Sequence, residues 1–157
     1  MKIILLPILA CIFLSLEICA QSPIILDEFD NRPCDHYLAT MDATLAKAAE
    51  NPQSTVYVIL YEGKESRYNF RKSKPEFVYP HRGSAEAKIR SMKRYISVVR
   101  KFPVDRFRFV KGGFREKLSV EIWLVPPGAE LPKLSPTLPT MRYSKGKPKG
   151  FCLWCCD

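Results

Sequence analysis

Apolar residues recur at helical spacing in two segments of the chain, 35–50 and 84–101. In the second segment the apolar side chains step by four and three residues, which places them on one face of a helix. That face consists of Ala85, Ile89, Met92, Ile96 and Val99. In the first segment the same spacing joins Leu38, Met41, Leu45 and Ala48. We therefore predict two helices, the first capped by Asp35 and ended by Pro52, the second capped by Ser84.

Other segments have the pattern of β-strands. Residues 55–61 (TVYVILY) are β-branched, aromatic and apolar on both faces, as expected of an interior strand covered by helices. Phe107 and Phe109 alternate with arginines, and residues 118–124 alternate again, so each segment predicts a strand with one buried face. A short apolar run at 23–26 indicates an edge strand.

The order of these elements predicts the fold class. A strand–helix–strand unit prefers a parallel, right-handed crossover, so the strands at 56–61 and 107–110 are expected to run in the same direction. The last two strands are joined by a few residues around Gly112 and Gly113, so they are expected to run in opposite directions. We therefore predict an α+β fold, a two-layer β-α-β-α-β-β sandwich with a mixed four-stranded sheet and two helices on one face.

Composition divides the chain into three regions. Residues 1–20 begin with a positive charge and continue as an apolar run, so we expect a signal peptide that is cut after Ala20. A retained anchor and lipid attachment at Cys19 are the alternatives. Residues 21–125 form a predicted single α/β domain, and residues 126–157 form a proline-rich tail with a cysteine-rich tip. The expected location is therefore secreted or periplasmic, with no transmembrane segment after signal cleavage.

The charge of the chain indicates the class of its partners. A formal net charge of +9 and a pI near 9.3 favour anionic partners such as cell-wall polymers, lipid headgroups, acidic glycans or nucleic acid. The alternative is that this charge serves only to keep the protein soluble.

Cysteine usage predicts disulfide bonds. The cysteines that remain after signal cleavage are Cys34, Cys152, Cys155 and Cys156. An even number of cysteines in an oxidising compartment favours disulfides, and we expect Cys34 to pair with one of the three others. A zinc site would need a second ligand pair, and a redox motif normally opens a helix, which cannot follow at the chain end.

Catalysis, a metal centre and a cofactor have little support in the sequence. His36 and His81 have no obvious nucleophile beside them. The pair Gly112-Gly113 leads into a strand, whereas a phosphate-binding loop leads into a helix. We therefore expect no enzyme activity, no metal and no cofactor.

Residues 64–82 form a predicted long loop in which cations alternate with aromatic side chains. A long loop inside a compact domain is often functional. Interleaved cations and aromatic rings can hold phosphates, sulfates or sugar rings. The alternative is a mobile insert whose aromatic side chains lie on the domain.

The strings TVYVILYEG, AEAKIRSMKRYI, FPVDRFRFVKGG and SVEIWLV occur in this order. Together they resemble the C-terminal domain of OmpA-like peptidoglycan-binding proteins over about residues 24–125. The matching motifs are Tyr95-Ile96, Val104-Asp105-Arg106-Phe107 and Val120-Glu121-Ile122. The segment EIWLVPPGAELP also resembles uncharacterised secreted bacterial proteins built on the same plan. The resemblance implies that the strand at 118–125 lies inside the sheet, between the first and second strands.

The resemblance also implies where a ligand would bind. Family members hold the amine and carboxylates of diaminopimelate with an aspartate after the second strand and an arginine early in the second helix. Here the arginine position falls on Lys88, and no aspartate matches after Tyr61, so an acidic ligand without an amine is expected. The helix N-terminus favours an anion. The residues expected to bind it are Lys88, Arg82, Lys64, Arg67 and Tyr68.

The expected function is a non-catalytic secreted or periplasmic binding domain for a cell-wall or other anionic ligand. Peptidoglycan or another anionic polymer is the expected partner, and nucleic acid is not. The alternative is an interaction protein whose proline-rich, cysteine-tipped tail docks on a partner. A thiol-redox or metal-binding protein is the third hypothesis.

Overall fold

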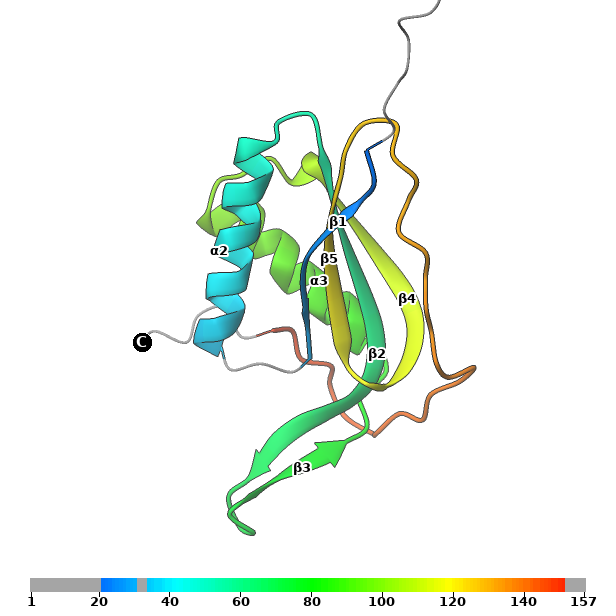
Figure 1. The fold of residues 1–157 in the computed structure, drawn as a ribbon. Helices are drawn as coiled ribbons and strands as arrows, with labels where there is room; N and C mark the ends of the chain where they lie inside the picture. The colour runs from blue at the N-terminus through cyan, green and yellow to red at the C-terminus, as the bar shows by residue number, and fades with distance from the viewer. Residues whose placement is uncertain (1–20, 31–33, 152–157) are drawn as a thin grey trace, which may run out of the picture.

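The computed structural model describes residues 21–30 and 34–151, and it contains both predicted helices and all the predicted strands (Figure 1). The strands are β1 (Ile24–Phe29), β2 (Thr55–Asn69), β3 (Lys74–Val78), β4 (Phe107–Lys117) and β5 (Ser119–Val125). The helices are α2 (Cys34–Glu50) and α3 (Ser84–Arg94), followed by a π-helical turn η1 (Tyr95–Val99) and a short 3₁₀ turn η2 (Val104–Arg106). Among the described residues, no helix is long and apolar enough to cross a membrane.

The sheet is mixed, as the element order predicts. Strand β5 pairs antiparallel with β1 on one side and with β2 on the other. Strand β2 pairs in parallel with β4, which is the expected direction across the α3 crossover. The strand at 119–125 therefore lies between the first and second strands.

The predicted four-stranded sheet is wrong by one strand, because the segment 64–82 is no loop. Strand β2 continues beyond the core to Asn69 and turns back as β3, with Glu65 opposite Val78 and Tyr68 opposite Pro75. Main-chain pairing holds this segment together. Because neither of its faces packs on the core, its sequence lacks the strong apolar alternation that would have predicted a strand. The extension starts at Gly63, where a Cβ atom would lie 2.1 Å from the Lys117 carbonyl carbon. Only glycine allows this close approach of two strands.

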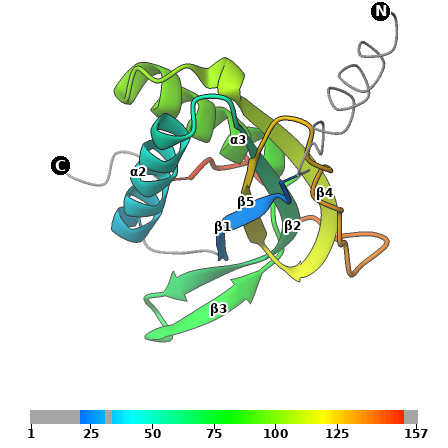
Figure 2. The ribbon, with the colours of Figure 1, turned by 45° about the horizontal axis from the view of Figure 1, so that its top comes forward.

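Both helices cover one face of the sheet and form the core with it (Figures 1 and 2). On the predicted face of α3, Ala85, Met92 and Ile96 are completely buried, whereas Ile89 and Val99 are only partly buried at its edge. The π-helical turn explains part of this difference. Val99 ends this turn, whose wider bonds, such as Arg100 N–H to the Tyr95 carbonyl (3.0 Å), change the spacing of side chains from that of an α-helix.

The C-terminal strap (residues 126–151) is the chain after β5, and it docks on the rest of the molecule. It passes along the other side of the sheet from the helices and returns beneath α3 (Figure 1). Its backbone donates to the Phe114 carbonyl from Thr137 (2.9 Å) and to the Pro80 carbonyl from Ser144 (2.8 Å). The proline-rich tail is therefore engaged by its own chain over residues 126–151.

The strap is fastened to the sheet by Arg115. The guanidinium carbon lies 3.6 Å from the centre of the Tyr61 ring, and the group donates to the buried carboxylate of Glu121. It also donates to Ser135 of the strap, at 2.6 Å to the hydroxyl and 3.2 Å to the carbonyl. One side chain therefore connects β2, β4, β5 and the strap.

The end of the strap packs against the start of α2. Phe151 stacks on Tyr37 with ring centres 4.4 Å apart, and its N–H donates to the Ser91 hydroxyl (3.0 Å). Close by, Cys34 is disulfide-bonded. The partner of Cys34 lies outside the described residues, as do Cys152, Cys155, Cys156 and the expected signal peptide.

Candidate functional site

The structure does not gather the five predicted binding residues into one site. Lys88 is only 3% exposed, and its Nζ atom lies 2.7 Å from Glu65 Oε1 and 5.4 Å from the centre of the Phe151 ring. A lysine held this way is paired with a carboxylate inside the protein, so it does not offer a charge to a ligand. Sequence reasoning placed Lys88 correctly on α3, but it missed the partner carboxylate on β2.

The other predicted residues lie in three different places. Arg82 lines a pocket at the N-terminus of α3. Lys64 lies over the Tyr79 ring, 5.2 Å from its centre, beside a different groove. Arg67 and Tyr68 lie on the β2–β3 extension, where Arg67 is 3.6 Å from Glu65. Of the five, only Arg82 therefore belongs to the pocket beside the helix N-terminus.

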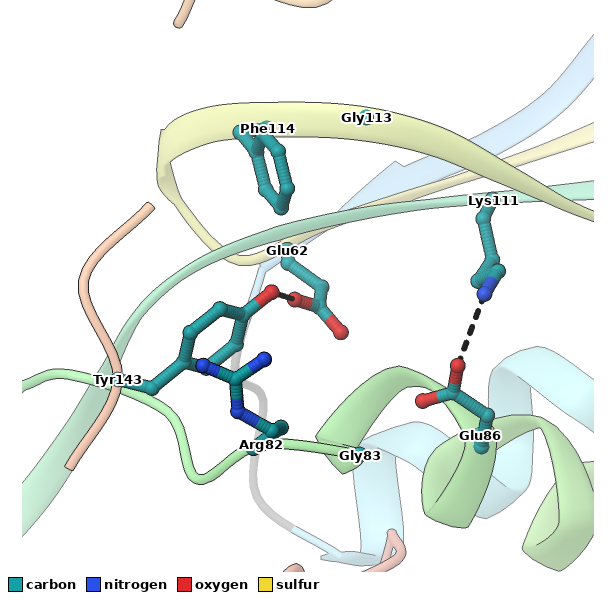
Figure 3. Close-up of a pocket in the computed structure, with 8 residues that line it drawn as sticks. All are labelled: Glu62, Arg82, Gly83, Glu86, Lys111, Gly113, Phe114 and Tyr143. Carbon is teal, nitrogen blue, oxygen red and sulfur yellow. Dashed lines mark hydrogen bonds and ion pairs between the residues drawn. The ribbon is translucent and has the colours of Figure 1, made fainter. Parts of the chain in front are cut away.

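This pocket has a volume of about 260 Å³ and lies between β4 and the start of α3 (Figure 3). Four separate parts of the chain build it: the middle of β2, β4, the entry to α3, and the strap. Its lining residues are Glu62, Arg82, Gly83, Glu86, Lys111, Gly113, Phe114 and Tyr143. We call it the α3 pocket.

The N-terminus of α3 is already occupied by a carboxylate of the protein. Glu62, which follows the apolar run of β2 and is itself buried, accepts the Ala85 N–H at 3.1 Å. Gly83 stands at the N-cap with a φ of 85°, so the expected Ser84 cap is wrong. Glu62 satisfies the helix dipole and a free N–H group. The helix end is therefore no open anion site, contrary to the expectation from sequence.

Tyr143 of the strap closes the pocket over Glu62. Its hydroxyl donates to the second oxygen of Glu62, and the Arg82 guanidinium carbon lies 5.3 Å from the centre of its ring. Burial, followed by the hydrogen bond and repulsion from Glu62, raises the pKa of Tyr143 to about 12. Tyr143 is therefore a neutral hydrogen-bond donor in this pocket at physiological pH.

A second ion pair crosses the mouth of the pocket (Figure 3). Lys111 Nζ of β4 lies 2.8 Å from Glu86 Oε1 in the first turn of α3, and both side chains are at least half exposed. The hydrogen bond from Lys111 lowers the pKa of Glu86, and the same bond raises the pKa of Lys111. Both groups are therefore charged at neutral pH.

The pocket thus presents both signs of charge, with Phe114 as an apolar wall. Its lining residues include no serine, threonine, cysteine or histidine that could form a nucleophile–base pair. Within residues 21–30 and 34–151, no group of His, Cys, Asp and Glu side chains could hold a metal ion. The arrangement is suited to recognising a polar ligand by hydrogen bonds and charge.

Sequence reasoning missed most of this site. Glu62 carried a usable signal, because a carboxylate directly after a buried strand lies at the edge where the next helix begins. Tyr143 carried none, because it lies 81 residues further along in a proline-rich segment. No protein-family model, curated protein or solved structure matches this chain. The resemblance to OmpA-like domains therefore stays a prediction.

Proposed function

We propose that this protein is a non-catalytic secreted or periplasmic binding domain that holds a cell-wall ligand in the α3 pocket. The observation that supports this proposal is the set of oppositely charged side chains around one cavity, Arg82 and Lys111 with Glu62 and Glu86. Such a pocket matches a ligand with a carboxylate and an amine, as found in the peptides of peptidoglycan. The expectation of a ligand without an amine is replaced, because Glu86 provides an amine partner.

The groups at the mouth can change partners at low cost. Exposed ion pairs such as Glu86–Lys111 are worth at most about 1 kcal/mol, so a ligand that offers both charges can replace their mutual bond. Arg82 is exposed and can donate two parallel hydrogen bonds to a carboxylate. Glu62 is 9% exposed and already bonded on both oxygens, so it forms a fixed floor.

An OmpA-like plan is part of this proposal. The order β1-β5-β2-β4, with β5 antiparallel between β1 and β2, supports it. In such a plan the ligand lies beside the N-terminus of the second helix, where the α3 pocket is found. This chain also differs from that plan at one defined position. Lys88, which occupies the place of the family's arginine, is paired with Glu65.

Co-sedimentation with purified peptidoglycan tests this function. We expect Arg82→Ala and Lys111→Gln each to weaken binding about tenfold, the usual effect of losing a charged hydrogen bond. Lys47→Gln is the matched control, because Lys47 forms an equally exposed ion pair with Glu50 on α2. If all three variants sediment like the unmodified protein, the α3 pocket is not the binding site. If binding by the unmodified protein and by all three variants disappears at raised salt, it is only diffuse charge attraction.

A further inference from the structure

The β2–β3 extension is an arm that projects from the rest of the molecule. We call residues 64–79 the hairpin arm, and both views show it standing clear of the helices and of the central sheet (Figures 1 and 2). It carries large apolar side chains that are left in solvent. Phe70 is 86% exposed, Phe77 56% and Tyr68 55%. Exposed aromatic residues gathered on one element mark an interaction surface.

The aromatic side chains share one side of the arm. Residues directly opposite in an antiparallel pair point to the same face, and so do residues two apart on one strand. Tyr68 lies opposite Pro75, and Ser66 lies opposite Phe77. Tyr68, Pro75 and Phe77 therefore form one apolar face, and Phe70 extends it into the turn.

The arm that carries this apolar face is also rich in cations. The arm contains five cations and two carboxylates, a net charge of +3. Both carboxylates are already engaged, Glu65 with Lys88 and Glu76 with Lys72. Arg71 and Lys74 flank the tip and are exposed. The tip thus combines exposed aromatic side chains with exposed positive charges.

Side-chain hydrogen bonds brace the turn. Asn69 Oδ1 accepts the N–H groups of Arg71 (3.0 Å) and Lys72 (3.2 Å), while its Nδ2 donates to Glu76 at 2.9 Å. Lys72 Nζ reaches the other oxygen of Glu76 at 2.7 Å. A preorganised tip can enter a partner surface without a further cost of ordering it.

We propose that the hairpin arm docks this protein on anionic lipid bilayers, with Phe70 inserted at the headgroup–acyl boundary and Arg71 and Lys74 on the headgroups. Aromatic side chains favour this boundary, and cations beside them gain from the negative surface potential. The chemistry recognised is a mixed surface of apolar chains below phosphate charges. This binding is separate from the α3 pocket and does not depend on it.

The ring geometry favours a bilayer over an anionic polysaccharide. A polysaccharide stacks its sugar rings on a row of flat, coplanar aromatic faces. Here the Tyr68 and Phe70 rings meet edge to face at 73°, with centres 5.1 Å apart, and present a wedge. Phe70 also lacks a polar group that could bond to a sugar hydroxyl, so the fit is to acyl chains.

Vesicle sedimentation with the full chain tests the proposal, with phosphatidylglycerol-containing vesicles and pure phosphatidylcholine vesicles as the probes. We expect binding to the anionic vesicles only. Phe70→Ser should weaken it roughly tenfold or more, the effect of losing one buried aromatic side chain. Arg71→Glu with Lys74→Glu should weaken it at least about tenfold. Val98→Ser is the control for Phe70→Ser, because it removes another exposed apolar side chain. Arg90→Glu with Lys133→Glu is the control for the double charge reversal, because it changes the net charge by the same amount.

A depth measurement separates insertion of the arm from binding by the apolar residues 1–20. A tryptophan is placed at the tip by Phe70→Trp, and brominated lipids should quench its added fluorescence. Val98→Trp, on η1 away from the arm, should show no such quenching. Equal vesicle binding by Phe70→Ser, an unquenched tip, or binding to dextran sulfate with none to vesicles would each overturn the proposal.

Discussion

Replacement of Arg115 by methionine tests whether one side chain holds the strap on the sheet. Methionine keeps much of the apolar stem and removes the guanidinium with all of its hydrogen bonds. The side chain of Glu121 is only 8% exposed, so its carboxylate would lose its ionic partner in a buried position. The strap would at the same time lose both bonds between Arg115 and Ser135, while the Ser135 N–H would still donate to the Tyr61 hydroxyl (3.2 Å).

The size of the effect follows from these contacts. Breaking a buried ion pair from one side costs about 3–5 kcal/mol of unfolding free energy, because the remaining charge stays desolvated. Two donors remain on Glu121, Trp123 Nε1 at 3.1 Å and the Tyr61 hydroxyl at 3.4 Å, and they offset part of this cost. Loss of the cation–π contact with Tyr61 adds about 1 kcal/mol. We therefore expect Arg115→Met to lower the free energy of unfolding by about 4 kcal/mol. This is a large fraction of the total unfolding free energy of a typical protein, about 5–15 kcal/mol.

Urea unfolding of a double-mutant cycle measures it. The cycle contains the unmodified protein, Arg115→Met, Glu121→Gln and the double variant. Because glutamine removes the stranded charge, the double variant should be more stable than Arg115→Met by roughly 2 kcal/mol. Lys47→Met is the control, because Lys47 forms an exposed pair with Glu50, and its loss should change stability by less than about 1 kcal/mol. A change within about 1 kcal/mol for Arg115→Met would refute the reasoning.

Two further predictions concern Tyr143 and Gly63. The pKa of Tyr143 is about 12 in the folded state, above the ordinary tyrosine value of 10.0, so the unfolded chain releases this proton first as pH rises. The contribution of this group to the free energy of unfolding is therefore complete below pH 10 and is lost as pH rises towards 12. Tyr143→Phe should reduce this loss of unfolding free energy at alkaline pH by about 1 kcal/mol after solvent screening. Urea unfolding across the same pH range measures the difference. Gly63→Ala should lower the free energy of unfolding by at least about 3 kcal/mol or prevent folding, because the new methyl group would meet the Lys117 backbone. The methyl group of Gly128→Ala meets no atom within 4 Å, so this variant should lose only about 1 kcal/mol. Equal melting temperatures for the two alanine variants would contradict the close approach at Gly63.

The fold was predictable where one periodicity decided burial. The apolar stripe on α3 and the continuous apolar run in β2 each have one arrangement that buries them, and the parallel crossover follows from their order. The hairpin arm was missed for the opposite reason. Its strands bury little, so main-chain pairing and the Asn69 turn define it, and neither leaves an apolar pattern.

The candidate site was less predictable because its charges pair across long sequence separations. Lys88 and Arg82 look alike in the sequence as cations near the start of a helix. The structure distinguishes them, because Glu65 reaches Lys88 from β2, while Arg82 remains exposed over Tyr143. Which cation stays available to a ligand depends on the partner that the fold brings to it, and no local pattern encodes that partner.

The strap connects the stability of this fold to its candidate site. Tyr143 reaches Glu62 from a part of the strap that is fixed on both sides. Before Tyr143, Arg115 holds Ser135, and after it, Tyr37 and Ser91 hold Phe151. The neighbouring Ser144 is also held, because its N–H donates to the Pro80 carbonyl. A segment held at both ends positions a side chain between them at little further entropic cost. Loosening either end should therefore weaken the α3 pocket while leaving its other lining residues in place. The hairpin arm lies outside this closed path, which is why vesicle binding should survive an Arg115 substitution that weakens binding in the pocket.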